Sequence, residues 1–191
     1  NILQVVMVPA MGLSMAISTL VGQNIGAGNI ERAAQIGRLG AMLGFASLQV
    51  FGIVVFLFAP QFVAFFVPGD PAVIAAGAGF LRIMSLAWGF LGLQFALTGV
   101  FRASGNMVLT MVLTLVSQWV VQFPLAYVLS KHTDLHEQGI WWALPIANIV
   151  TALITLCLYA KGDWKKKRLI EPEEEIAGKV TEDILVGEVS R

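Results

Sequence analysis

The side chains with ligand-binding chemistry in the apolar stretches of this sequence are amides, methionines and small hydroxyls. They recur at helical spacing, so they fall on one face of each expected helix. Lipid solvates amides poorly, and flexible, polarizable methionines suit surfaces that accept many apolar shapes. We therefore expect these faces to point at other helices or at a watery cavity. The candidate residues for a substrate cavity are Gln4, Met7, Met11, Met15, Met111, Gln118, Gln122 and Asn148.

The alternative for each of these residues is ordinary helix packing with interhelical hydrogen bonds. Prolines favour the cavity, because three of the expected helices contain one, at Pro9, Pro124 and Pro145. A proline removes a hydrogen bond from the helix, and interrupted membrane helices commonly line cavities.

Arg82 is the one charge well inside an expected membrane helix. A charge inside a membrane is costly, and by default it indicates a functional site. At helical spacing it shares a face with small residues, which suits the interior of a bundle; these are Ala75, Ala78, Ser85, Gly89 and Ala96. The alternative is that Arg82 binds helix-end carbonyls or extends outward to the membrane surface.

Acidic residues and catalytic groupings are missing from every expected span. The sequence therefore predicts neither an enzyme nor a proton-coupling carboxylate within this chain. His132 and His136 have a spacing that could hold a metal, but a solvated loop is the favoured reading, and we expect no metal site. The single cysteine, Cys157, excludes an intramolecular disulfide.

The composition places the chain in the membrane. Of 191 residues, 57% are hydrophobic and 13% charged, with a mean hydropathy of +0.79, whereas soluble domains average roughly 25% charged residues. Residues 1–162 carry ten of the charges and residues 163–191 carry fourteen. No signal peptide is expected, because the N-terminus lacks a basic region and a cleavage site.

Five membrane spans are expected, since a spanning helix needs about 20 mainly apolar residues. They cover residues 1–23, 36–66, 71–101, 107–130 and 139–161. Asp70 and Pro71 should open the third span as N-cap and first-turn proline. We therefore predict an all-α, polytopic transmembrane bundle over residues 1–162, and a tail over 163–191 that is disordered or a short surface helix.

The distribution of Lys and Arg predicts the orientation. One set of connections holds eight basic residues, and the other set holds only Lys131; the eight are Arg32, Arg38, Arg102, Lys161, Lys165, Lys166, Lys167 and Arg168. The first set should be cytoplasmic, which places the C-terminus inside a multi-pass protein of the inner or plasma membrane.

Two glycine-containing loops separate the apolar stretches on this side. In the first, Gly26 and Gly28 permit a tight reversal, and Asn29 is expected to cap a helix that begins at Ile30. The second loop breaks the chain at Gly105 and Asn106. The alternative for the first is a plain connection between helices. Further on, Gly40 and Gly44 form a small-xxx-small pattern that indicates close helix packing.

Both loops resemble those of the multidrug and toxic compound extrusion (MATE) family. Residues 21–29 with Glu31, Arg32 and Ala33 are similar to the loop between the second and third helices of a lobe, and residues 101–106 to the loop between the fourth and fifth. The resemblance covers about residues 1–168, with the expected two spans between the loops. It implies half of a two-lobe, twelve-helix transporter, here the second lobe without its first helix.

This resemblance implies a secondary-active exporter that exchanges Na⁺ or H⁺ for organic cations and other drugs by alternating access. The coupling-ion site is expected outside this chain, because the matching spans lack the carboxylates that one branch of the family carries, and no other cofactor is implied. The expected partners are the lipid bilayer, the missing lobe or a second chain, and small organic cations, without nucleic acid. The gating candidates are Gly26, Gly28, Asn29, Arg32, Arg102, Gly105 and Asn106.

Two other functions fit the same topology. One is a related flippase for a lipid-linked oligosaccharide. The other is a non-transporting remnant or assembly subunit, which the missing helices would favour.

Overall fold

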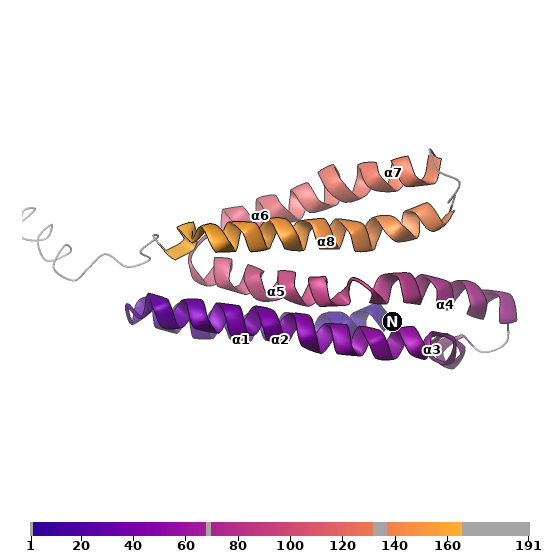
Figure 1. Cartoon of the computed structure of the whole chain (residues 1–191), viewed down its shortest axis with the longest axis horizontal. Helices are drawn as coiled ribbons and strands as arrows, with labels where there is room; N and C mark the ends of the chain where they lie inside the picture. The colour runs from indigo at the N-terminus through magenta and orange to yellow at the C-terminus, as the bar shows by residue number, and fades with distance from the viewer. Residues whose placement is uncertain (1, 68–69, 132–136, 166–191) are drawn as a thin grey trace, which may run out of the picture.

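The apolar runs form helices that lie side by side along the long axis of the molecule (Figure 1). The structure, a computed structural model, describes residues 2–67, 70–131 and 137–165. Its helices are α1 (Ile2–Gly26), α2 (Ile30–Leu57), α3 (Ala59–Phe66), α4 (Pro71–Ser85), α5 (Trp88–Ala103), α6 (Met107–Leu115), α7 (Phe123–Lys131) and α8 (Glu137–Lys161). A π-helix, η1 (Val116–Gln122), joins α6 to α7, and a short 3₁₀ turn, η2 (Asp163–Lys165), follows α8.

The expected bundle of about five spans is confirmed. Four stretches are long and apolar enough to cross a membrane, namely α1, α2, the continuous run from Met107 to Lys131, and α8; α4 and α5 together make a fifth. The expected second span is wrong in its bounds, because α2 begins at Ile30 and ends at Leu57, and α3 is a separate helix. The third is also wrong as a single helix, because α4 and α5 meet at an angle of 47°.

The ends of the helices follow the capping residues only in part. Asp70 caps α4 as expected, since its carboxylate accepts a hydrogen bond from the Ala72 amide at 2.8 Å. Asn29 occupies the N-cap position of α2, but its side chain makes no capping hydrogen bond. Pro9 and Pro145 lie inside the continuous helices α1 and α8, so neither breaks its span. Each proline removes one backbone hydrogen bond from its helix, and the neighbouring turns keep the helix continuous.

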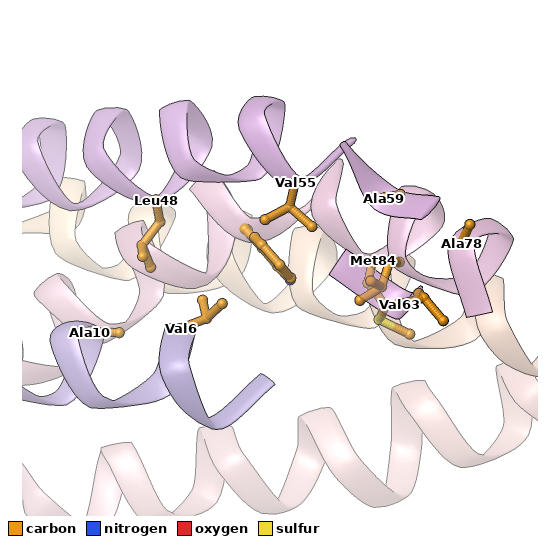
Figure 2. Close-up of a cluster of buried hydrophobic side chains, with 10 residues drawn as sticks. Val6, Ala10, Leu48, Val55, Ala59, Val63, Ala78 and Met84 are labelled. Atoms are coloured by element: carbon orange, nitrogen blue, oxygen red, sulfur yellow. The ribbon is translucent and has the colours of Figure 1, made fainter. Parts of the chain in front are cut away.

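The core forms where α2 packs on α5. A Cβ built on Gly44 would lie 2.7 Å from the carbonyl oxygen of Gly92, so the two backbones touch with no room for a side chain. This close approach confirms the packing role predicted for the small-xxx-small pattern of α2. On one side of it, α1, α2, α3, α4 and α5 contribute to an apolar cluster that includes Val6, Leu48 and Met84 (Figure 2). A second cluster, around Val21, Leu97 and Phe101, fills the end nearer the α1–α2 turn.

The fourth span lies at the edge of the bundle. α6, η1 and α7 pack on α8 and α5, while α1 packs on α2 and α5 (Figure 1). Only 6% of the most apolar window in the run from Met107 to Lys131 is buried within the chain, compared with 28–33% for α1, α2 and α8. Most of the surface of this span is therefore available to lipid or to another protein segment.

The first three residues of the predicted C-terminal tail pack against the end of α8. Asp163, Trp164 and Lys165 form a 3₁₀ turn, and the Trp164 side chain is only 1% exposed. Its ring stacks on Tyr159, with 5.4 Å between the ring centroids, and its indole nitrogen donates a hydrogen bond to the Tyr159 carbonyl at 3.2 Å. These contacts order the turn. The remainder of the predicted tail, residues 166–191, lies outside the described residues.

Candidate functional site: two turns and two exposed faces

The two loop motifs form turns of the same construction. Gly28 and Gly105 both adopt a positive φ, of 75° and 72°, which residues with a Cβ rarely adopt. After each glycine comes an asparagine whose amide donates a hydrogen bond back over five residues, from Asn29 to the Asn24 carbonyl and from Asn106 to the Phe101 carbonyl. This is the pattern of a glycine-terminated helix that reverses at once into the next helix.

Both turns lie at the same end of the bundle as the C-terminal end of α8 (Figure 1, left). The exposed side chains of Arg32 and Arg102 flank them, and Lys161 and Lys165 lie beside them at the end of α8. Lys131 lies at the other end, with α7. The structure thus places the described members of the predicted basic set at one end of the bundle. That this end faces the cytoplasm stays a prediction.

The second turn is held more firmly than the first by its side chains. Ser104 is fully buried, and its hydroxyl donates to the Phe101 carbonyl at 3.0 Å and accepts from the Asn106 side-chain amide at 3.3 Å. In the first turn the Asn24 side chain donates to the Leu20 carbonyl at 2.8 Å within its own helix. Space around the first turn is also open, since a Cβ built on Gly26 or Gly28 would meet no atom within 4 Å.

The first predicted cavity face is a methionine stripe on α1. The side chains of Met7, Met11 and Met15 are 39%, 56% and 70% exposed, and that of Gln4 is exposed as well. Ser14, on the same helix, is buried against α5, where its backbone carbonyl approaches Gly99. The stripe therefore remains uncovered within the described part of the chain.

The second predicted face centres on the π-helix. Gln118 and Gln122 line a shallow pocket of about 270 Å³ together with Trp119, Phe123 and Ala126. The Trp119 and Phe123 rings stack, with centroids 6.0 Å apart. A π-helix inside a membrane helix often marks a functional position. Sequence reasoning missed both rings, although aromatic residues directly after both glutamines could have indicated them.

The predicted cavity residues do not meet in one enclosed site. Met111 is exposed on α6, Asn148 is half-buried on α8, and the α1 stripe lies on helices that pack on the other side of α5. Hydroxyl groups between η1 and α8 take part in ordinary helix packing, as in the alternative to a cavity. Thr151 is buried and donates to the Ser117 hydroxyl at 2.6 Å, which ties the π-helix to α8.

Of the two readings for Arg82, the structure favours the alternative, in which the side chain leaves the bundle interior and binds a carbonyl at a helix end. The Arg82 side chain is exposed, its Nε donates to the Phe56 carbonyl at 3.4 Å, and its guanidinium lies 6.0 Å from the Phe56 ring centroid. Of the residues predicted to share its face, Ala78, Ser85, Gly89 and Ala96 are buried and Ala75 is exposed. A long side chain can leave a buried face, and here it reaches the carbonyl near the end of α2.

The break between α4 and α5 was not predicted, because it contains no proline. The N–H groups released by the bend need acceptors, since lipid offers none. One comes from α2, where the Gln49 side-chain oxygen accepts from the Gly89 amide at 3.1 Å. The hydroxyl of Ser85 donates to the Arg82 carbonyl at 2.9 Å on the other side of the break. Gln49 therefore stabilises the bend from a neighbouring helix.

Metal-binding groups do not gather in the parts of the chain that the structure describes, where no cluster of three His, Cys, Asp or Glu side chains occurs. His132 and His136 lie outside these residues.

Comparison with known proteins gives consistent matches. A family model described as MatE matches residues 1–128. "Probable multidrug resistance protein NorM" of Thermotoga maritima is 30% identical over 173 residues, which is 91% of this chain and 37% of that protein. "Probable multidrug resistance protein YpnP" of Bacillus subtilis is 29% identical over 165 residues, 86% of this chain and 36% of that protein. The chain thus spans just over a third of the length of these curated relatives.

Solved structures share the fold. One described as the inward-facing conformation of a multidrug resistance MATE family transporter of the MOP superfamily superimposes with a TM-score of 0.78 at 20% identity. The match covers 87% of this chain and 39% of that one.

Proposed function

The chain belongs to the MatE family, and we propose that it works as the second lobe of a secondary-active exporter of organic cations and other drugs. The observation that carries the proposal is the family match to an apolar bundle whose exposed faces combine methionines, amides and aromatic rings. The multidrug-resistance names of the relatives support the substrate class.

The surface around η1 has the chemistry to hold an organic cation. The stacked rings of Trp119 and Phe123 present π-electrons to a positive charge, and such a contact is worth about 0.5–2 kcal/mol depending on solvation. Gln118 and Gln122 add polar groups that orient the ligand at the edge of the rings. We assign the substrate contact of this lobe to these four residues.

The methionine stripe of α1 provides a second, apolar contact surface of the proposed exporter, separate from the η1 pocket. Methionine side chains adapt to ligands of different shape, which suits a transporter with many substrates. In the proposed exporter these exposed side chains face the other lobe across the central cavity. Rocking of the two lobes would then expose the cavity to either side, with the paired turns at Gly28 and Gly105 acting as gating elements.

Coupling to Na⁺ or H⁺ is assigned to acidic residues elsewhere in the complete protein. None of the expected spans of this chain contains Asp or Glu, and cation-coupled transporters generally keep such residues within the membrane.

Ethidium efflux from bacteria that lack their own exporters tests the substrate contact. Cells would express the complete polypeptide that carries this chain, either unaltered or with Trp119→Ala. The loss of a cation–π contact should reduce the initial efflux rate by about three- to tenfold at limiting dye, with membrane protein levels unchanged. Val120→Ala is the matched control, because this neighbouring side chain is exposed on the same π-helix but does not line the pocket. Equal rates for both variants and the unaltered protein would contradict the assignment.

A further inference from the structure

A groove between α2, α5 and α8 lies outside the proposed transport path. It has a volume of about 530 Å³, within the usual range for small-molecule sites. Its walls are apolar and come from three helices, with Phe45 on α2, Leu93 and Leu97 on α5, and Leu156 on α8. None of the predicted cavity residues lines it.

One end of the groove is polar and positively charged. Arg38 and Tyr159 lie there, and the Tyr159 hydroxyl donates to the Ala34 carbonyl at 2.9 Å, one turn before Arg38. Lys165 extends this end, with its amino group 5.8 Å from the centroid of the Trp164 ring that stacks on Tyr159. Among the residues that the structure describes, no hydrogen bond or ion pair engages the exposed Arg38 guanidinium.

The polar end carries the residue types that mark a membrane surface. Tyr159 is two residues from the end of α8, and the turn that follows brings Trp164 and Lys165 against it. Tyrosine and tryptophan concentrate at the boundary between the hydrocarbon core and the lipid headgroups. The apolar walls run from this boundary toward Phe45 and Leu93, and hence into the hydrocarbon.

We propose that this groove binds one anionic phospholipid, with an acyl chain along the apolar walls and the phosphate on Arg38. A lipid phosphate would pair its negative charge with the guanidinium, and guanidinium–phosphate contacts are strong and frequently bidentate. Organic cations fit poorly, because Arg38 and Lys165 would repel them. The predicted orientation favours the same ligand, because anionic lipids concentrate in the cytoplasmic leaflet. The proposal does not depend on the transport function.

Lipid titration followed by native mass spectrometry tests the site. The complete polypeptide, purified in detergent, would be titrated with phosphatidylglycerol or with phosphatidylcholine of the same acyl chains. The unaltered protein should bind phosphatidylglycerol more tightly. Arg38→Gln should weaken phosphatidylglycerol binding about tenfold and remove the preference, because it removes one charged hydrogen-bonding partner. Lys131→Gln also removes one positive charge, but at the other end of the bundle, and should leave the preference intact.

Filling the groove tests the acyl-chain contact separately. Ala46 is exposed on the groove wall, so Ala46→Phe should occupy the groove without disturbing the core. Both phospholipids should then bind about tenfold more weakly, with an unchanged unfolding midpoint. The proposal is overturned if Arg38→Gln keeps the preference for phosphatidylglycerol, or if Ala46→Phe binds both lipids as before. Retention of neither lipid by the unaltered protein would also overturn it, as expected if another protein segment covers the groove.

Discussion

Gly28 holds the backbone conformation on which the first turn depends. Its φ of 75° lies in the left-handed region, and its surroundings are empty, so only backbone strain opposes a side chain there. Gly26, two residues earlier, ends α1 without a positive φ and also has open space around it. Because neither position is crowded, a comparison of the two isolates the effect of backbone strain.

Gly28→Ala should therefore destabilise the protein by about 1 kcal/mol, because alanine must adopt the left-handed conformation. Gly26→Ala is the control, and it should have little effect or be slightly stabilising, since alanine favours the helix end. Unfolding midpoints, followed by tryptophan fluorescence in detergent, measure the difference. Equal midpoints for the two variants would show that the first turn does not require this φ.

Arg32 and Arg102 flank the two turns with exposed guanidinium groups. If they form charged contacts in one gating state, Arg32→Ala or Arg102→Ala should lower efflux about tenfold, the equivalent of one charged hydrogen bond. Lys131→Ala, at the other end of the bundle, should leave efflux unchanged. Efflux assays must be paired with membrane protein levels, because a loss of protein would assign a structural role instead.

At this scale the sequence predicted the turns better than the cavity. A glycine followed by asparagine has a local physical meaning, so the positions of Gly28, Asn29, Gly105 and Asn106 could be predicted without a structure. The roles of Arg82 and Thr151 depend on which helices are neighbours. Helical spacing alone could not show that Arg82 reaches the Phe56 carbonyl, or that Thr151 donates to Ser117.

At the scale of helices, close contact between α2 and α5 organises the bundle. Gly44 and Gly92 face each other with their backbones in contact, and Gly52 similarly approaches the Ser85 carbonyl. Close backbone approach increases dispersion contacts in a membrane, where the hydrophobic effect does not drive helices together. The bend between α4 and α5 lies between the Gly52–Ser85 contact and the Gly44–Gly92 contact. The Gln49 side chain satisfies one of the amides at this bend.

Gly92→Ala should destabilise the protein by about 2 kcal/mol or more, because the new methyl group would overlap the backbone of Gly44, which cannot rotate away. Gly12→Ala on α1 is the matched control, since a Cβ there meets no atom within 4 Å. It should be neutral or stabilise by up to about 1 kcal/mol. Midpoints of unfolding in detergent test both, and a Gly92→Ala variant as stable as Gly12→Ala would contradict the packing described here.

The number and order of spans could be predicted from hydropathy, because apolar runs of this length have few alternatives in a bilayer. The bend at Ser85–Trp88 and the π-helix could not. The bend contains no proline, and Gln49 from another helix satisfies one of its amides. Prolines were an uneven guide: Pro9 and Pro145 lie in continuous helices, whereas Pro124 lies two residues after the π-helix, where a break in the helix ladder was expected.

At the scale of the whole molecule, the two ends of the bundle differ in charge, and this difference predicts the orientation. In a Cys157→Ala background, Ala27→Cys should react with a membrane-impermeant maleimide only after cells are opened, because the α1–α2 turn is expected in the cytoplasm. Lys131→Cys, at the other end of the bundle, should react in intact cells. The reverse labelling pattern would contradict the predicted orientation.

The proposed lobe leaves two surfaces uncovered, the α1 methionine stripe and most of the fourth span. The relatives are nearly three times as long as the matched region, so a partner lobe could cover the first of these. The central proposal is that the complete protein uses this lobe to export drugs in exchange for Na⁺ or H⁺ that flows down its gradient.

Transport in proteoliposomes tests that claim most directly. The complete polypeptide would be reconstituted, and ethidium movement followed under an imposed Na⁺ gradient, an imposed H⁺ gradient, or neither. We predict movement that requires one of the two gradients and that falls at least about threefold in Trp119→Ala, but not in Val120→Ala. Ethidium movement that is absent, or that is the same with and without a gradient, would contradict the account.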